Sequence, residues 1–198
     1  GKTTSIGMML GLITPTSGQI FIDGISLEPK NRIKLLNLMN FASPYIELPK
    51  KLSVKQNLEI YARLYGVKNI SERITEMIED LNLKNFLNKK TGELSSGQKN
   101  RVSLAKSLIN KPRLLFLDEP TASLDPDVGD FVREYLEKYK KKNELTILLA
   151  SHNMKEVERL CDNIVMMKQG KIVDNGTCSE LILKHGRKNL EDTFLKIA

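Results

Sequence analysis

Two short apolar segments constrain the fold of this chain more than any other feature. Leu114–Asp118 and residues 145–150 are runs of large apolar side chains without the polar alternation of a half-exposed strand. Such runs are typical of strands that are buried on both faces of a parallel sheet. Because helical patterns separate them, they predict an α/β fold with a mostly parallel sheet and helices on both sides.

The middle of the chain, residues 51–112, has a different pattern. Residues 53–65 and 71–83 carry apolar side chains at the spacing of amphipathic helices, and Ser71 is the expected N-cap of the second helix. A third helix is expected over residues 99–109. The apolar faces of the first two helices indicate packing surfaces rather than cofactor sites.

These patterns divide the chain into three segments. Residues 1–50 are the expected first part of an α/β core, residues 51–112 an inserted α-helical subdomain, and residues 113–198 the second part of the core. Within the last segment, we expect residues 177–184 to form the terminal helix. The lysine-rich run at residues 138–142 is expected to be the solvated end of a helix, where cations suit the helix dipole.

Composition excludes several classes of protein. The chain has 31 Lys and Arg and 24 Asp and Glu, and the net charge of +7 allows acidic partners without identifying one. No apolar run approaches the roughly 20 residues of a membrane-spanning helix. The two cysteines cannot form a disulfide framework or a zinc site by themselves, so a reducing compartment is expected.

The first residues match the end of the phosphate-binding loop G-x-x-x-x-G-K-[ST]. Gly1, Lys2 and Thr3 take its last three positions, and the helical spacing that follows predicts that residues 1–4 begin a helix. Free N–H groups at such a helix start suit a phosphate. The alternative is an ordinary helix N-terminus with a polar first turn. We expect the earlier part of the loop to lie upstream of this sequence.

A second helix start of this kind lies at Leu94-Ser95-Ser96-Gly97-Gln98. Ser95 or Ser96 can cap the helix that follows, and Gly97 lets backbone N–H groups approach an anion closely. The alternative is an ordinary serine-rich cap without a ligand.

Acidic residues follow the first apolar strand. Asp118 and Glu119 lie at the strand end where open α/β sheets bind ligands. Asp118 can hold Mg²⁺ through water, and Glu119 can polarise a water for in-line attack on a γ-phosphate. The alternative is a pair of exposed acids at a turn. His152 follows the next buried strand at the same edge and can donate to a γ-phosphate, although a lone histidine is more often structural.

The order of GKTT, LSSGQ, LLFLDEP, SLD and SH, over essentially the whole chain, resembles the ATP-binding cassette (ABC) family, of which LSSGQ is the signature motif. The resemblance implies an ATP-driven dimer that uses ATP and Mg²⁺. Two cassettes enclose two ATP molecules, and each site combines the P-loop of one chain with the signature of the other. The partner cassette would be an identical or a different chain.

The resemblance also implies a role for each matching residue. Gly1 belongs to the P-loop, Lys2 would neutralise the β- and γ-phosphates, and Thr4 would bond the α-phosphate. Thr3 would ligate Mg²⁺, and Asp118 would support it.

Catalysis and dimer closure are implied in the same way. Glu119 would be the general base, and His152 would sense the γ-phosphate. Asp125, in the Ser-Leu-Asp segment, would lie across the dimer interface and couple the two sites. The residues that would close over the partner's ATP are Ser95, Gly97 and Gln98.

Three departures from the family pattern are visible. Ser96 replaces the usual second glycine of the signature, so its side chain is expected to point away from the nucleotide. Pro44 stands where the family has a glutamine that touches Mg²⁺, so coupling is expected to use another group, such as Ser43 or a water. The aromatic residue that stacks on adenine is expected upstream, so this chain alone should bind ATP poorly.

The resemblance implies a transport function. Residues 41–67 and the C-terminal end are similar to cassettes that export drugs, polysaccharides or lipids. The expected partner is a separate integral membrane permease, docked near residues 45–52 and holding the chain at the cytoplasmic face of the membrane, without nucleic acid. Two alternatives are a soluble ABC-type ATPase acting on ribosomes or DNA and a non-hydrolysing regulatory ATP-binding module.

Overall fold

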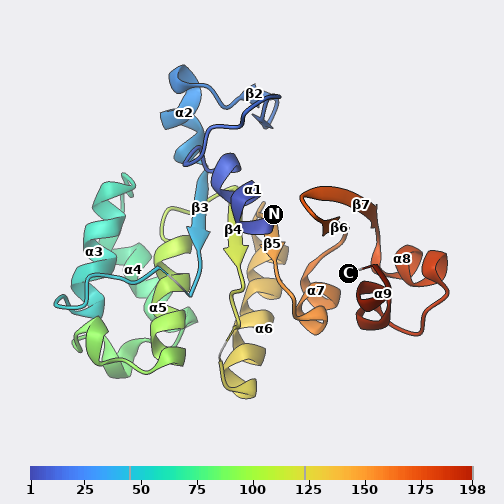
Figure 1. The fold of residues 1–198 in the computed structure, drawn as a ribbon. Helices are drawn as coiled ribbons and strands as arrows, with labels where there is room; N and C mark the ends of the chain where they lie inside the picture. The colour runs from blue at the N-terminus through green and yellow to red at the C-terminus, as the bar shows by residue number, and fades with distance from the viewer. Residues whose placement is uncertain (45, 123, 198) are drawn as a thin grey trace.

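A three-stranded parallel sheet lies at the centre of the computed structural model, which describes residues 1–44, 46–122 and 124–197 (Figure 1). Its strand order is β3 (Met39–Ala42), β4 (Leu114–Asp118) and β5 (Thr146–Ala150). In register, Asp118 of β4 lies opposite Ala150 of β5. The predicted α/β fold is therefore confirmed, and the carboxyl ends of β4 and β5 meet at one edge.

Helices surround this sheet, and two antiparallel ribbons extend from it. The ribbons are β1 (Phe21–Ile22) with β2 (Ile25–Ser26), and β6 (Ile164–Lys168) with β7 (Lys171–Gly176). In chain order, the α-helices of the described residues are α1 (Lys2–Met9), α2 (Pro29–Leu36), α3 (Val54–Leu64), α4 (Ile70–Asp80), α5 (Ser96–Leu108), α6 (Pro126–Lys142), α7 (Met154–Leu160), α8 (Cys178–His185) and α9 (Leu190–Ile197). Two short 3₁₀ turns, η1 (Lys84–Phe86) and η2 (Thr91–Glu93), connect α4 to α5.

Both faces of β4 are buried, as its apolar run predicts. Leu115 and Leu117 pack into the cluster formed by α3, α4, α5 and α6. Phe116, which points to the opposite face, packs with Ile6 and Leu10 in and just after α1. Since successive strand residues alternate between faces, one short segment joins two hydrophobic clusters. This arrangement fixes α1 and the α5–α6 layer on opposite sides of the sheet.

The region between β3 and β4 is helical, and one detail differs from the sequence prediction. Helix α3 lies within the expected residues 53–65, and its N-cap is Ser53, whose hydroxyl accepts from the Gln56 N–H at 3.1 Å. The prediction that Ser71 caps the next helix is wrong, because α4 begins at Ile70 after Asn69. Ile70 packs against the large core cluster, and this contact favours an earlier helix start.

The C-terminal region also differs from the prediction. Helix α8 begins after Thr177, which forms a reciprocal cap with Glu180, and it ends at Gly186 with φ of +60°. A further helix, α9, follows and buries Leu190, so the expectation that α8 is the terminal helix is wrong. The left-handed glycine reverses the chain and lets α9 pack on α7 and α8.

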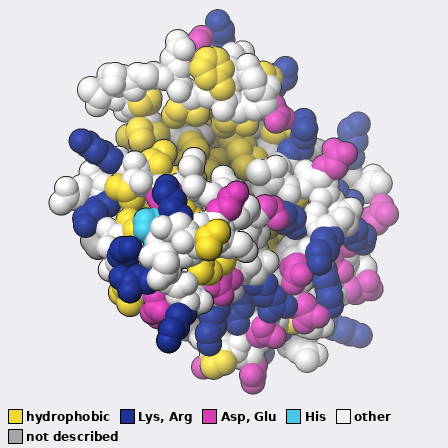
Figure 2. Space-filling view, turned by 90° about the vertical axis from the view of Figure 1, so that its right-hand side faces the viewer, with side chains coloured by type: hydrophobic (Ala, Val, Ile, Leu, Met, Phe, Trp, Pro, Cys, Tyr) yellow, Lys and Arg dark blue, Asp and Glu magenta, His cyan; other side chains and the backbone are white. Residues whose placement is uncertain are grey.

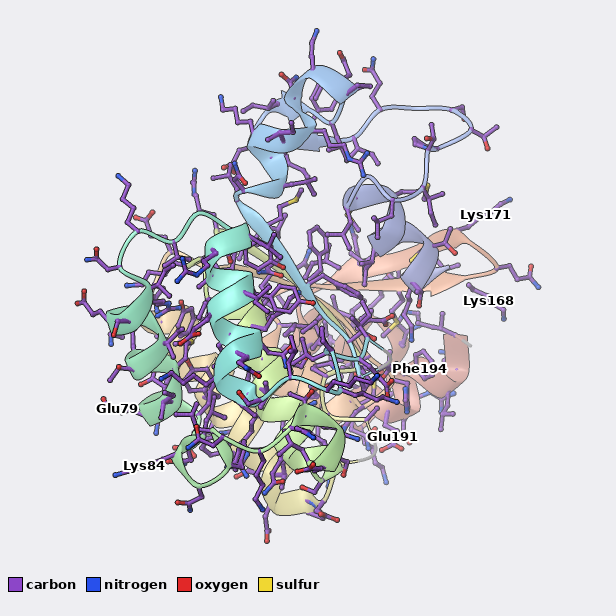
Figure 3. The ribbon with its side chains drawn as sticks, turned by 90° about the vertical axis from the view of Figure 1, so that its left-hand side faces the viewer. Glu79, Lys84, Lys168, Lys171, Glu191 and Phe194 are labelled. Atoms are coloured by element: carbon purple, nitrogen blue, oxygen red, sulfur yellow. The ribbon has the colours of Figure 1, made fainter. Side chains whose placement is uncertain are left out.

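Charges of both signs are interspersed on the surface. The face in Figure 2 carries Lys and Arg side chains beside Asp and Glu, and apolar side chains gather in a hollow on it. Lys168 and Lys171 lie at the tip of the β6–β7 ribbon, far from Glu79 and Lys84 of the helical region (Figure 3). Among the described residues, no helix combines the length and apolar character needed to cross a membrane.

The lysine-rich run ends α6, as predicted, because this helix extends to Lys142. Three of its four lysines are paired with carboxylates: Lys138 contacts Glu134, and Lys141 contacts Glu137 at 3.0 Å. Lys140 pairs with Asp162 in the loop before β6. These lysines therefore belong to a paired, solvated helix end.

Candidate functional site

The N-terminus of α1 lies against the carboxyl end of β4. The Thr3 hydroxyl donates to Oδ2 of Asp118 at 3.1 Å, although the two residues are 115 positions apart in the chain. Asp118 is 5% exposed, whereas Thr3 is exposed. The sheet edge therefore brings together two oxygen-bearing side chains that come from distant parts of the sequence.

Glu119 directly follows Asp118, and its carboxylate lies beside the side chains of Lys2 and His152. Its Oε1 is 2.7 Å from Nδ1 of His152 and 3.8 Å from Nζ of Lys2. The Glu119 side chain is 13% exposed, whereas those of Lys2 and His152 are 44% and 71% exposed. One carboxylate oxygen thus faces a solvent-accessible space that Lys2 and His152 border.

The backbone of Glu119 is unusual. Its φ of +52° lies in the left-handed region, which costs a non-glycine residue about 1 kcal/mol. The Glu119 N–H donates to the Ala150 carbonyl at 2.8 Å, and its carbonyl accepts from the Ala122 N–H at 3.0 Å. These bonds end β4 abruptly and turn the side chain toward the end of β5, where His152 lies.

The signature segment forms a tightly capped helix start. The Ser95 hydroxyl accepts from the Gln98 N–H at 3.3 Å, and the Gln98 side chain accepts from the Ser95 N–H at 3.1 Å. A Cβ on Gly97 would lie 3.1 Å from a methyl carbon of Val128 in α6. Gly97 is therefore also needed for close packing of α5 on α6, which the sequence argument had not included.

Helix α5 is bonded to the loop after Glu119. The Asn100 side-chain amide donates to the Pro120 carbonyl at 2.7 Å. This bond joins the second turn of the signature helix to the residue that follows the acidic pair. Asp125, the predicted interface residue, is the N-cap position of α6, while Ser123 of the same motif lies outside the described residues.

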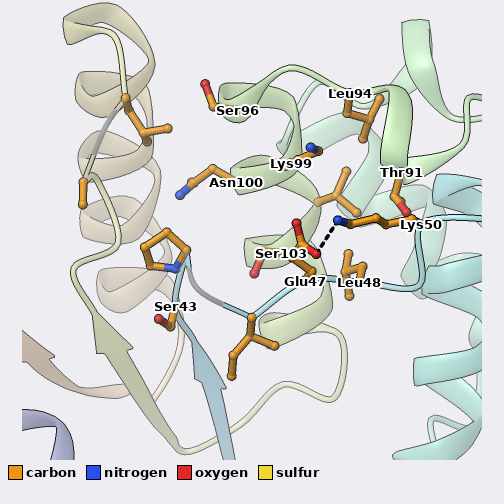
Figure 4. A pocket seen from close by; sticks show the side chains of 15 residues that line it. Ser43, Glu47, Leu48, Lys50, Thr91, Leu94, Ser96, Lys99, Asn100 and Ser103 are labelled. Carbon is orange, nitrogen blue, oxygen red and sulfur yellow. Dashed lines mark ion pairs between the residues drawn. The ribbon is translucent and has the colours of Figure 1, made fainter.

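A cleft of about 280 Å³ opens between α5 and the segment that follows β3 (Figure 4). Pro44 and Ser96 line it, and Glu47 and Lys50 form an ion pair of 2.7 Å beside it. Ser43 is buried. Figure 4 shows it next to the end of β3. The cleft overlaps the predicted docking segment, of which Tyr45 lies outside the described residues.

The site is suited to a metal that uses few protein ligands. Thr3 and Asp118 supply hydroxyl and carboxylate oxygens, the donors that Mg²⁺ prefers, and Mg²⁺ usually keeps several waters and binds substrate phosphates. Within residues 1–44, 46–122 and 124–197, no group of three or more His, Cys, Asp and Glu side chains could hold a metal ion. The donor set therefore fits Mg²⁺ bound together with a phosphate.

Two residues near Glu119 were not singled out from the sequence. Ser151 lies between Glu119 and Glu156, and Glu156 of α7 is 1% exposed. The available signal was the position of Glu156 four residues before buried Leu160, which places an acid on the buried face of a helix.

Comparisons with known proteins agree with this geometry. The family model described as "ABC transporter" matches residues 1–122. The chain is 31% identical to the ABC transporter ATP-binding protein NatA of Bacillus subtilis, covering 98% of this chain and 80% of NatA. It is 33% identical to the Nod factor export ATP-binding protein I of a Rhizobium species and 34% identical to the methionine import ATP-binding protein MetN 2 of Staphylococcus epidermidis.

The length of overlap differs among these relatives. The match to the Nod factor protein covers 93% of this chain but only 61% of that protein. The match to MetN 2 covers 99% of this chain and 59% of MetN 2. A solved structure titled as the ATP-binding subunit of an ABC transporter superposes with a TM-score of 0.89 at 25% identity, covering 100% of this chain and 83% of that one. On the family match, the relatives and the shared fold, this chain belongs to the ABC transporter family as an ATP-binding domain.

Proposed function

We propose that this chain hydrolyses ATP and that the energy drives a membrane transporter. The observation that carries the proposal is the position of Glu119, within 2.7 Å of His152 and 3.8 Å of Lys2 at the edge where α1 begins. A carboxylate here can accept a proton from a water aimed at a γ-phosphate. A purely regulatory ATP-binding module would not need a base at this place.

The N-terminus of α1 is the proposed phosphate site. The free N–H groups and partial positive charge of the helix start favour an anion, together with Gly1 of the P-loop. Lys2 carries its charge toward the β- and γ-phosphates, and Thr4 binds the α-phosphate. Thr3 and Asp118 are the proposed holders of Mg²⁺, which neutralises phosphate charge when it is bound.

Glu119 and His152 are the proposed catalytic residues. Oε1 of Glu119 takes the proton of the attacking water, and the His152 imidazole, whose Nδ1 contacts that oxygen, orients toward the γ-phosphate. Both side chains reach the site from strand ends that the parallel sheet holds in register. The rigid sheet therefore supplies the positioning on which in-line attack depends.

We propose that the complete site forms between two cassettes, of identical or different chains. In this arrangement Ser95, Gly97 and Gln98 bind the partner's ATP, and Asp125 lies across the interface. Support comes from the two separate phosphate-suited helix starts of α1 and α5. We also propose the division into a core of residues 1–50 and 113–198 with a helical subdomain at 51–112.

An integral membrane permease is the proposed partner, and the cleft beside Pro44 and Glu47 is its proposed docking site. Such a partner would hold the chain at the cytoplasmic face of the membrane. Relatives carry both "export" and "import" in their names. We favour export, because residues 41–67 and the C-terminal end are similar to exporter cassettes.

Replacement Glu119→Gln tests this function in the full-length protein. Loss of the base should lower ATP turnover by roughly 100-fold or more while ATP still binds, so an ATP-bound dimer accumulates. Phosphate release and size-exclusion chromatography with ATP measure the two effects. Glu144→Gln, at an exposed position outside the site, is the matched control and should hydrolyse at the parent rate. Parent-rate hydrolysis by the Glu119 variant would refute the base assignment.

A further inference from the structure

Helix α7 buries an acid that the proposed mechanism does not use. Glu156 is 1% exposed, and its Oε2 accepts from the Ser151 hydroxyl at 2.7 Å. In the part of the chain that the structure describes, its Oε1 makes no hydrogen bond of normal length and angle, although the Thr121 hydroxyl is near enough to act on the carboxyl. An ionised carboxylate with a buried, unpartnered oxygen is costly, and an apolar residue would pack here without that cost. The presence of the acid therefore indicates a role beyond packing.

The surroundings of Glu156 raise the pKa of its carboxyl above the ordinary value for glutamate. Burial raises the pKa of this carboxyl, while the hydroxyls of Ser151 and Thr121 and the positive charge of Arg133 on α6 act in the opposite direction. The nearby Glu119 charge raises the pKa further. A neutral Glu156 carries a proton of its own and can donate it in a hydrogen bond.

Ser151 connects Glu156 to Glu119. Its hydroxyl oxygen is 2.7 Å from Oε2 of Glu156 and 3.4 Å from Oε2 of Glu119, and it also accepts from the Asn153 N–H at 3.0 Å. A serine hydroxyl has only one proton to donate. When Glu156 donates to Ser151, that proton is free to point at Glu119. The hydrogen bonds then run from Glu156 through Ser151 to Glu119.

Glu119 needs such a support when ATP is bound. Its Oε1 contacts the side chains of Lys2 and His152, which are also the groups proposed to turn toward the phosphates. Its Oε2 accepts from the backbone N–H of His152 at 3.4 Å, so the Ser151 hydroxyl is the second donor to that oxygen. Its backbone is in the unfavourable left-handed region, so the side chain is not held by local preference. Ser151 contacts Oε2 of Glu119, whereas Lys2 is paired with Oε1. The contact of 3.4 Å is long, as such contacts often are before substrate binds.

We propose that Glu156 is a positioning residue, which acts through the Ser151 hydroxyl to hold the Glu119 carboxylate toward the attacking water. The inference rests on the proposed function of Glu119 as the base. It assigns to α7 a part in hydrolysis, although this helix contributes no group that touches the nucleotide.

Paired substitutions in the full-length protein test the inference. Ser151→Ala breaks the connection, and Glu156→Met keeps the volume but removes the donor, so each should lower kcat about tenfold or more with an unchanged KM for ATP. Ser151→Thr and Glu156→Gln keep a hydroxyl and a neutral donor, so both should retain near-parent kcat. Glu158→Gln, at an exposed position of the same helix, is the control.

A double-variant cycle separates positioning from general damage. If Ser151 and Glu156 act through Glu119, then Ser151→Ala should cause little further loss of kcat in the Glu119→Gln background. Parent-like kcat in both Ser151→Ala and Glu156→Met, with Glu119→Gln inactive, would overturn this inference and leave the proposed function intact. If Ser151→Ala lowered kcat by the same factor in the parent and in the Glu119→Gln background, the inference would also be overturned. Parent-rate turnover by Glu119→Gln alone would instead remove the proposed function.

Discussion

At the scale of single residues, the conformation of Glu119 connects strand geometry to chemistry. A regular continuation of β4 would point this side chain out of one face of the sheet. The left-handed turn at φ of +52° instead directs it to His152. The strain is balanced by two backbone hydrogen bonds, to the carbonyl of Ala150 and from the N–H of Ala122. Unfavourable backbone conformations cluster at functional sites for this reason.

The buried carboxyl of Glu156 gives a pH-dependent stability prediction. Because its pKa is raised in the folded protein, the folded state binds more protons than the unfolded state above pH 4.5. The contribution of Glu156 to the free energy of unfolding therefore falls as the pH rises from the ordinary pKa of glutamate through the raised pKa of this carboxyl. Glu156→Gln removes this titration, so its free energy of unfolding relative to the parent should increase between about pH 5 and pH 8. Urea unfolding at both pH values measures the difference.

Glu158→Gln is the control for that measurement, since Glu158 is exposed and its replacement should show no such trend. If the difference in free energy of unfolding between Glu156→Gln and the parent were the same at both pH values, the pKa of Glu156 would be unchanged by folding.

The predicted catalytic residues could be found from sequence because they end buried strands. Asp118, Glu119 and His152 each follow an apolar run, and parallel strands bring their carboxyl ends to one edge. Ser151 and Glu156 could not be connected to them from sequence. Their contact depends on how the first turn of α7 folds back on the strand end, which is set by tertiary packing.

At the scale of elements, α5 joins the helical region to the core. Its C-terminal end is held by Arg73 of α4, which is 4% exposed. The guanidinium donates to the carbonyls of Leu108 and Ile109, to Tyr139 of α6 at 3.1 Å and to Glu76 at 2.6 Å. One side chain thus satisfies free carbonyl groups at a helix end and connects three helices.

Removal of that guanidinium should destabilise the fold. Arg73→Leu leaves buried helix-end carbonyls and the Tyr139 hydroxyl without their donor, so the free energy of unfolding should fall by about 3 kcal/mol or more. Glu76 would keep its contact with Lys111 at 3.7 Å. Arg73→Lys should recover only part of the loss, because an ammonium cannot reproduce the planar fork. Denaturant midpoints measure both variants.

Arg63→Leu is the matched control, because Arg63 is exposed in the last turn of α3; its effect should remain within about 0.5 kcal/mol. If Arg73→Leu changed stability no more than this control, the connection would be energetically unimportant.

Sequence periodicity predicted most helices but not their exact limits. Ser95 was one of the two caps expected for α5, and it caps this helix, which begins at Ser96 rather than at the expected residue 99. The start of α4 depends on the packing of Ile70, and the existence of α9 depends on its docking onto α7 and α8. Such nonlocal contacts leave little trace in the periodicity of a single sequence.

At the scale of the whole molecule, the docking proposal makes a prediction about membrane association. Ile46 is 52% exposed and lines the cleft between α5 and the segment after β3. Ile46→Asp would place a charge in an apolar contact, so the full-length protein should lose most of a co-purifying multi-span membrane protein while ATP binding is kept. Affinity purification from detergent-solubilised cells with mass spectrometry measures the loss.

Ile33→Asp on α2 is the matched control, since Ile33 is 77% exposed and lies away from this cleft. The permease should remain bound to that variant. Recovery of the parent only with ribosomal proteins or DNA-bound factors would favour the soluble alternative instead.

The bond between Asn100 and the Pro120 carbonyl has a consequence for how two sites would behave together. In the proposed dimer, the start of α5 contacts the partner's nucleotide, while Asn100, one turn later, is attached to the loop beside this chain's own Glu119. Binding of ATP at the partner's P-loop would therefore move the loop beside this chain's own base, Glu119. Hydrolysis at one site should therefore depend on whether ATP is bound at the other, and the pair of cassettes would act as one unit rather than as two independent hydrolases.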